Sequence, residues 1–324
     1  MKKFLKKLGL LLLIFIAINV VTNYVYEASA NEAIENKTHK NYLKWTDIHQ
    51  NKNSYDLVVM GASRAYYAFS PTIIDSSLNM NSYNMGTSAQ DIVESYYSLK
   101  EIFEYQSPKY VVLDLFFPLS DNVHDYSQIF SNASFFNSTK TKFELITEGY
   151  GGSGIANYLM PVLKYNNYIK QDLLGLFKEK EAIKSETNWI KGHLHDTVTV
   201  TDKQIAKFEP THNFENTAFD KKRFEKYFNK IKALVEANNA KIICVRVPYP
   251  PSRLLLSETD DENEYYSNFM SKVNVPYFDL NSYKSDKYIY IDQDFADYHH
   301  PNYRGAEKAS KQLVEAIKQI KQQK

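Results

Sequence analysis

The stretch Tyr110-Val-Val-Leu-Asp-Leu-Phe-Phe117 is the strongest strand signal in the chain, and it decides the fold class. Such a continuous apolar run, rich in branched and aromatic residues, is typical of a strand that is buried on both faces. Similar runs occur at 56–60, 81–85, 241–247 and 275–280, with helical patterns between several of them. Strands that alternate with helices predict a mostly parallel sheet covered on both faces, so we predict an α/β fold.

Two helical patterns flank these strands. The segment from Ala89 to about Tyr105 repeats apolar residues at helical spacing, and the face that we expect to be buried consists of Ile92, Tyr96, Leu99 and Phe103. The last helix is expected from about Asn302 to Ile320, with an inner face of Ala306, Ala309, Leu313, Ile317 and Ile320.

The alternation of strands and helices is lost in the middle of the chain. From Phe117 to Phe224 the sequence mixes helical and loop signals, and it shows no internal repeat. We therefore predict one α/β domain over 55–324 with an insertion, or cap, at about 120–222. The polar stretch 31–54 has a weak helical pattern, which predicts a stalk or a lead-in helix.

The N-terminus has the pattern of a membrane anchor. Four lysines occur within the first seven residues, and the 19 residues from Leu8 to Tyr26 carry no charge. At 1.5 Å per residue this helix nearly spans a hydrocarbon core of ~30 Å. The lysines predict a cytoplasmic N-terminus, so the body is expected to be extracytoplasmic on a single-pass anchor at 1–30. A cleaved signal peptide is the alternative, with Ala28-Ser-Ala30 as its cleavage site.

Composition excludes some functions. Lys and Arg number 39 against 38 Asp and Glu, and without the four N-terminal lysines the remaining chain has a net charge of −3. This balance argues against a nucleic-acid-binding body, because binding to phosphates needs a concentrated positive charge. The single cysteine, Cys244, lies in a strand-like run and is expected to be a buried apolar residue.

Residues that follow the predicted strands are the first candidates for a site, because ligands of open α/β sheets bind beyond the carboxyl ends of the strands. Gly61-Ala-Ser63 follows the first strand, so Ser63 lies in a tight strand-to-helix turn, as a nucleophile or as a helix N-cap. Gly86 follows the second strand. Its N–H is either a donor to a reacting oxygen or part of a simple turn.

A third candidate segment is Asp297-Tyr-His-His-Pro-Asn-Tyr-Arg-Gly305, directly before the last helix. His300 has the chemistry of a base for Ser63, and Asp297, three residues earlier, can orient its imidazole. The alternative is a capping aspartate beside surface histidines. His299 is a second candidate base, but the spacing from Asp297 and to Asn302 favours His300.

Together these three segments, in this order, resemble the SGNH/GDSL hydrolase superfamily. The resemblance covers 55–324 except the insertion, and it implies a flavodoxin-like three-layer fold with a doubly wound, mostly parallel sheet. It implies Ser63 as nucleophile, His300 as general base and acid, and Asp297 as its orienting carboxylate. The N–H groups of Ser63 and Gly86 would stabilise the oxyanion.

The sequence departs from the family pattern after the third strand. The family places an oxyanion-binding Asn there, whereas this chain has Phe117-Pro-Leu-Ser-Asp-Asn122, so Asn122 is the only candidate substitute in that loop. Arg64, next to Ser63, is expected either to bind a substrate anion or to pair with a carboxylate.

The Gly-Ala-Ser-Arg form and the anchor also resemble a narrower group, which contains the D-alanyl-lipoteichoic acid transfer protein and the SGNH-like partners of membrane-bound O-acyltransferases. This resemblance implies a cell-envelope glycan or teichoic acid as substrate and a membrane-bound O-acyltransferase as partner. The leading hypothesis is an anchored serine esterase or O-acyltransferase. The alternatives are a non-catalytic scaffold and a plain secreted carboxylesterase.

Two further motifs do not predict cofactor or metal sites. Gly149-Tyr-Gly-Gly-Ser-Gly154 matches a dinucleotide-binding pattern but lies in the irregular insertion, outside a strand–helix unit. His193 and His195 are two residues apart and lack a defined third metal ligand. We therefore expect no cofactor and no bound metal.

Overall fold

The computed structural model describes residues 1–35, 39–115, 125–175, 188–208, 220–256, 260–282 and 288–322. The chain divides into two compact units, Met1–Leu43 with His124–Ile183 and Lys44–Val123 with Lys184–Lys324. Each unit is described here by itself. The second unit contains the parallel sheet, and the first contains the N-terminal helix.

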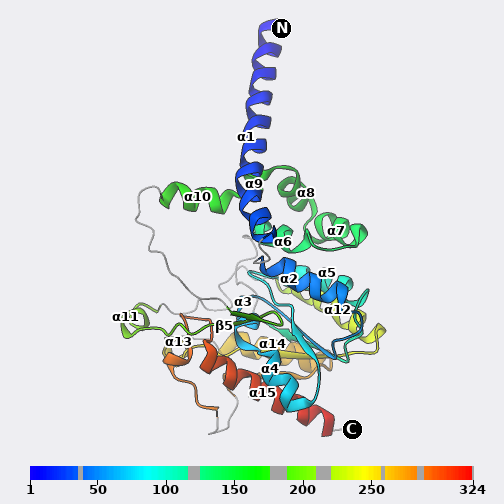
Figure 1. Cartoon of the computed structure of the whole chain (residues 1–324), viewed down its shortest axis with the longest axis vertical. Helices are drawn as coiled ribbons and strands as arrows, with labels where there is room; N and C mark the ends of the chain where they lie inside the picture. Colours follow the sequence, from blue (N-terminus) through cyan, green and yellow to red (C-terminus); the bar gives the residue numbers. More distant parts are fainter. Residues whose placement is uncertain are drawn as a thin grey trace. The chain divides into compact units, whose positions relative to one another are not determined.

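The second unit is built on a five-stranded sheet with the order β2-β1-β3-β6-β7 (Figure 1). All four strand pairs are parallel. The strands are β1 (Leu57–Met60), β2 (Ser82–Asn84), β3 (Tyr110–Asp114), β6 (Lys241–Arg246) and β7 (Tyr277–Asp279). Each lies within one of the five apolar runs, so the prediction of an α/β fold with a parallel sheet is confirmed.

The strand order is that of the flavodoxin-like doubly wound folds. Chain direction across the sheet reverses between β1 and β3, and ligands of such sheets bind beyond the strand ends at this switch point. In the register of the sheet, Met60 lies opposite Leu113 at the carboxyl ends of these two strands. The residues that follow β1 therefore occupy the preferred place for a site.

Helices cover both faces of the sheet. The buried core on one face joins Val59 and Val112 of the sheet to Phe69, Ile74 and Leu313. Figure 1 shows α5 and α12 on the other side of the sheet from α4 and α15. The helices of this unit are α3 (Ser63–Ala68), α4 (Pro71–Leu78), α5 (Ile92–Phe103), α11 (Asp202–Ile205), α12 (Lys221–Ala237), α13 (Pro251–Leu256), α14 (Asp260–Lys272), the short 3-10 helix η4 (Asp292–Asp294) and α15 (Tyr303–Gln322).

The buried faces of α15 and α5 were predicted with different success. In α15, Ala306, Ala309, Leu313 and Ile317 are buried as expected, and Ile320 is partly buried. In α5 the buried set includes Val93, Tyr97 and Ile102, whereas Tyr96 and Phe103 are only half-buried. Ile92 and Leu99 are buried as expected, so half of the predicted face is confirmed; the other half was wrong because aromatic and aliphatic residues occur all round this helix.

A short antiparallel hairpin lies at the β2 edge of the sheet. Its strands are β4 (Asn188–Ile190) and β5 (His193–His195). The N–H of Asn84 in β2 donates to the Lys191 carbonyl in the hairpin turn at 3.0 Å. The hairpin also carries Trp189, whose ring lies against that of Tyr66 in α3.

The first unit is helical. Its longest helix is α1 (Lys2–Glu35). The next helix, α2 (Lys40–Gln50), belongs to the second unit from Lys44 onward, and there Trp45 and Ile48 are buried. The other helices are α6 (Tyr126–Ala133), α7 (Thr139–Glu144), the π-helix η1 (Leu145–Gly149), α8 (Gly151–Leu159), α9 (Pro161–Lys164) and α10 (Asn166–Gly175). One helix of the described chain, α1, is long and apolar enough to cross a membrane, with a mean hydropathy of 2.2 over its best 18-residue window.

Candidate active site

The turn after β1 presents Ser63 at the start of α3. Gly61 has φ +145°, a conformation that other residues rarely adopt, and a Cβ there would lie 2.9 Å from Cβ of Asp114. Only glycine therefore allows the chain to turn this tightly beside β3. As the first residue of α3, Ser63 is half-buried, and its hydroxyl lies at the carboxyl edge of the sheet.

The loop before α15 is closed on itself. Phe295 forms a β-bridge with Pro301, and the Ala296 N–H donates to the His300 carbonyl at 2.8 Å. Asn302, which is fully buried, accepts the Arg304 N–H at 3.0 Å and donates from its amide to the Gln293 carbonyl at 2.8 Å. These bonds fix the loop to the first turn of the helix, so the side chains of Asp297 and His300 are held by a rigid frame.

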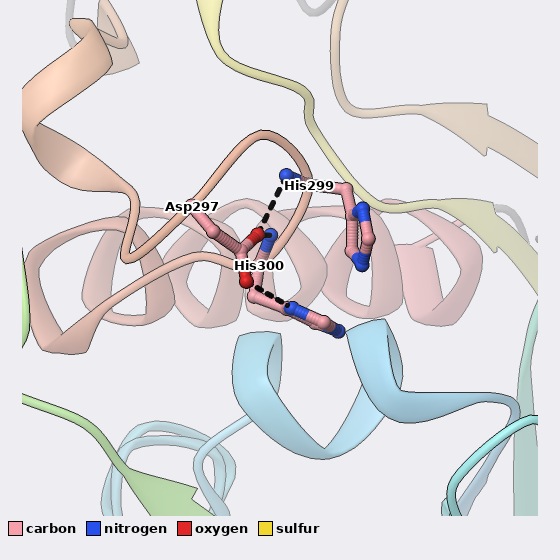
Figure 2. Close-up of side chains that lie close together, drawn as sticks. All are labelled: Asp297, His299 and His300. Atoms are coloured by element: carbon pink, nitrogen blue, oxygen red, sulfur yellow. Dashed lines mark hydrogen bonds and ion pairs between the residues drawn. The ribbon is translucent and has the colours of Figure 1, made fainter. Parts of the chain in front are cut away.

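Ser63, His300 and Asp297 form a continuous hydrogen-bonded chain. His300 Nδ1 lies 2.7 Å from Asp297 Oδ2, and His300 Nε2 lies 2.8 Å from Ser63 Oγ. A carboxylate only accepts, so Nδ1 carries the proton and Nε2 accepts the Ser63 hydroxyl. Figure 2 shows Asp297 and His300 extending from the same loop, with the carboxylate bonded to the imidazole.

The second oxygen of Asp297 is held by the backbone. Asp297 Oδ1 accepts the N–H groups of His299 and His300, each at 2.8 Å (Figure 2). Burial alone would raise the pKa of Asp297, but the hydrogen bond and charge of His300 outweigh it and hold the pKa well below its usual range. Asp297 is therefore an anion that orients the imidazole.

His299, the second candidate base, lies beside His300. Its ring meets the His300 ring edge-on, with 4.0 Å between centroids. Burial and the neighbouring His300 lower the pKa of His299 to about 3, so this imidazole is neutral at physiological pH. His300 has both partners that a proton relay needs, the Asp297 carboxylate and the Ser63 hydroxyl.

The predicted oxyanion donors differ in their environments. The Ser63 N–H is the first of α3, and no acceptor among the described residues binds it. The Gly86 N–H instead donates to Asn84 Oδ1 at 3.1 Å, so its predicted role requires Asn84 to share or release this bond. Asn122 lies outside the described residues.

A buried lysine holds the Gly86 loop. Lys44 of α2 is 2% exposed, and its ammonium donates to the Gly86 carbonyl. The same ammonium lies over the rings of Tyr66 and Trp189, 5.1 and 5.2 Å from their centroids. Sequence reasoning missed this residue, because it lies in the polar stretch 31–54 that was expected to be a stalk or a lead-in helix, where it resembles any surface lysine.

Arg64 has partners inside the protein. It is fully buried, its guanidinium donates to the Val247 and Pro248 carbonyls, and it lies 3.8 Å from the Tyr249 ring centroid. Its charge also acts on Asp114, which is fully buried at the end of β3. These contacts favour the predicted alternative of a structural charge over that of a substrate contact.

Tyr67 is a second residue that sequence reasoning missed. Its ring stacks on the His300 imidazole, with 4.4 Å between centroids and 29° between planes. Tyr67 follows Ser63 by four residues in α3, so both lie on one face of the helix. This spacing was a usable signal, since the helix that presents a nucleophile also presents the residue one turn later to the same space.

The described residues contain one cluster with metal-ligand chemistry, Asp297, His299 and His300 (Figure 2), whose ligand atoms lie within 4.8 Å of one another. A metal there would need a nitrogen of His300, and both nitrogens already bind Ser63 and Asp297. The observed bonds therefore suit proton transfer. His193 and His195 have separate partners, the Tyr66 carbonyl at 2.9 Å and the Tyr303 ring.

Comparisons with known proteins give distant matches. One protein-family model matches residues 204–322, less than half of the chain. No curated protein matches the sequence.

Among solved structures, a putative acylhydrolase from Bacteroides fragilis is 12% identical, with a TM-score of 0.38, and the match covers 82% of this chain and 86% of that one. A GDSL-like lipase from Bacteroides thetaiotaomicron is 11% identical, with a TM-score of 0.40 and coverage of 87% and 98%. A catalytic mutant of an acetylxylan esterase from Geobacillus stearothermophilus is 10% identical, with a TM-score of 0.37 and coverage of 82% and 95%. All three TM-scores are below 0.5, so the proposed function rests on the geometry of the site and not on these matches.

The buried carboxyl group of Asp114, beside Gly61, predicts a pH dependence of stability. Burial raises the pKa of Asp114 to about 6, against the lowering effects of the Arg64 charge and the Val247 N–H. The folded state therefore binds this proton more tightly than the unfolded state, and the free energy of unfolding should fall by about 3 kcal/mol in all as the pH rises from about 3 to about 7, with most of the fall between pH ~4 and ~6. The Asp114→Asn variant should lack this fall.

Tryptophan fluorescence during urea unfolding of the detergent-solubilised chain measures this, because Trp45 and Trp189 both belong to the second unit. Asp202→Asn, which changes an exposed carboxylate, is the control and should follow the wild-type pH profile. Parallel profiles for wild type and Asp114→Asn would contradict the raised pKa.

Proposed function

We propose that this protein is a serine esterase or O-acyltransferase of the SGNH/GDSL type. The observation that supports this most strongly is the chain of hydrogen bonds from Ser63 through His300 to Asp297, at 2.8 and 2.7 Å. It lies beyond the carboxyl end of β1, beside the switch point of a doubly wound sheet. A capping serine and a surface histidine would have no reason to share a proton relay.

In the proposed reaction, Ser63 Oγ attacks the carbonyl carbon of an ester as its proton passes to His300 Nε2. Asp297 stabilises the resulting imidazolium, and the Ser63 N–H donates to the oxyanion. The tetrahedral intermediate then expels the alcohol, which takes the proton from His300, and an acyl group stays on Ser63. Water or a second hydroxyl, deprotonated by His300, attacks this acyl group and regenerates the serine.

We propose an extracytoplasmic location and a cell-envelope glycan or teichoic acid as the acyl acceptor. The support is the lysine-flanked α1 helix and the resemblance of the Gly-Ala-Ser-Arg motif to SGNH-like partners of membrane-bound O-acyltransferases. Exposed aromatic rings lie in and next to the loop that carries Asp297 and His300, with Tyr298 50% and Tyr303, the first residue of α15, 39% exposed. Such rings suit stacking against sugar faces. A membrane-bound O-acyltransferase is the proposed partner.

A non-catalytic scaffold is the second candidate function. The observation in its favour is the bond between the Gly86 N–H and Asn84, which occupies one predicted oxyanion donor. The intact relay from Ser63 to Asp297 argues against it, because a scaffold gains nothing from aligning a nucleophile with a base.

A fluorophosphonate probe separates these functions. The full chain should be modified at Ser63, because His300 removes the hydroxyl proton as the serine attacks phosphorus. The Ser63→Ala and His300→Ala variants should lose the modification, whereas Ser88→Ala, which changes another serine of this unit, should keep it. Intact-protein mass spectrometry and peptide mapping provide the measurement. An unmodified wild-type chain with a native circular dichroism spectrum would support the scaffold instead.

The stacked ring of Tyr67 should raise the rate of this modification. An aromatic contact of this kind contributes about 0.5–1.5 kcal/mol, so Tyr67→Ala should slow the reaction with the probe about two- to tenfold. Tyr67→Phe keeps the ring and should react at nearly the wild-type rate. Equal slowing in both variants would show that the hydroxyl, and not the stack on His300, is what matters.

A further inference from the structure

An uncharged, glycine-rich segment of the first unit has no role in the proposed chemistry. The 15 residues between Glu148 and Lys164 carry no charge, and they form α8, α9 and the turns beside them. A Cβ at Gly154 would lie 2.3 Å from the Ile146 carbonyl, so the glycine allows α8 to pack directly on η1. The segment therefore has a defined structure and is not a loose loop.

Its apolar side chains are exposed. Leu159 is 67% exposed, Tyr158 52%, Ile155 42% and Leu163 39%. These residues come from two consecutive short helices, α8 and α9. Scattered exposed apolar residues are normal, but a contiguous apolar and uncharged surface of this kind marks an interaction site.

Specific contacts tie this segment to α1. The Val162 N–H donates to Asn19 Oδ1 at 3.2 Å. Glu27 of α1 accepts from Lys164 Nζ at 2.8 Å and from the Tyr165 hydroxyl at 2.5 Å. Figure 1 shows α9 directly beside α1, within the same unit. The segment is thus held along the C-terminal half of the apolar helix.

The positions of these contacts along α1 indicate how deep the segment would lie in a membrane that α1 spans. Tyr26 ends the uncharged run of α1, and Asn19 lies seven residues earlier, which corresponds to about 10 Å along the axis. Interfacial helices are buried about 5–10 Å into the boundary of headgroups and acyl chains. The contact of Val162 with Asn19 therefore lies closer to the middle of the span than Tyr26 does. The Tyr26 ring stacks on Tyr165, with 4.9 Å between centroids.

We propose that α8 and α9 insert beside α1 into the membrane leaflet at the C-terminal end of the span, and that lipid covers their apolar surface. This inference rests on the proposed anchoring of α1. Lipid is favoured as the occupant because α9 contacts α1, whose apolar residues from Leu8 to Val25 are mostly exposed. The charged contacts lie at one end of the segment, where Lys164 and Tyr165 bind Glu27, and this is the end at which lipid headgroups would lie.

Quenching of a single fluorophore in the full chain tests this inference. Cys244 is fully buried, and burial raises the pKa of its thiol, so a thiol-reactive NBD dye should label only an introduced cysteine. Leu159→Cys places the dye on the proposed surface, and Leu163→Cys repeats the test if the first variant misfolds. Val20→Cys, 63% exposed on α1, is the lipid reference, and Lys203→Cys, exposed on α11, is the aqueous reference.

Each variant is reconstituted into phosphatidylcholine–phosphatidylglycerol vesicles. Doxyl-labelled lipid should quench the dye at Leu159→Cys several-fold more than at Lys203→Cys, and iodide should quench it several-fold less. Iodide quenching equal to that at Lys203→Cys would overturn the inference. Protection from both quenchers would also overturn it, because a protein surface and not lipid would then cover the site.

The same samples are tested with the fluorophosphonate probe at Ser63. Loss of lipid contact with normal Ser63 modification would refute the membrane insertion alone. Normal lipid quenching with an unreactive Ser63 would refute the proposed chemistry alone.

Discussion

The hydrogen bond from the Ser63 hydroxyl to His300 Nε2 is the interaction on which this account depends. It joins residues that are 237 positions apart, so it exists only when the whole second unit is folded. One partner is set by the turn after β1, which Gly61 makes possible, and the other by the closed loop before α15. A local motif could not create this geometry, because Ser63 and His300 are held by segments that are far apart in the sequence.

The surroundings of this bond hold both partners in place. Tyr67 stacks on the imidazole from the helix that presents the serine, and the Asp297 carboxylate binds the opposite nitrogen. Beneath the turn, the fully buried Arg64 donates to the Val247 and Pro248 carbonyls, and Asp114 accepts the Val247 N–H at 3.2 Å. These buried hydrogen bonds connect the residues around the Ser63 turn to the segment that follows β6. Rigid placement of this kind is what a catalytic serine requires.

The sequence predicted those features that local patterns determine. Strands buried on both faces leave largely apolar runs, which located most of the sheet, and the short strand β2 was located before Gly86. The motifs after β1 and before α15 supplied Ser63 and the Asp297–His300 pair. The features that depend on distant contacts were not predicted. Lys44 reaches Gly86 from a helix outside the sheet, and the bond between Asn84 and the Gly86 N–H depends on a side-chain rotamer.

The contacts made by the insertion were not predicted from the sequence either. Its Gly149–Gly154 motif was identified only as a pattern that lacked the context of a dinucleotide site, because glycine spacing alone does not say what the backbone approaches. The structure shows that Gly154 packs against η1, and that α9 contacts α1. Neither contact has a periodic signal in the sequence, since each depends on which helices become neighbours.

The central claim, that Ser63 and His300 act as one unit, is tested most directly by comparing ester cleavage in Ser63→Ala, His300→Ala and the double variant. Residues that act together in one step lose nearly all of their effect when either is removed. The account predicts that the two single variants and the double variant have the same residual rate. Losses that multiply in the double variant would mean that the two residues act independently, and would contradict it.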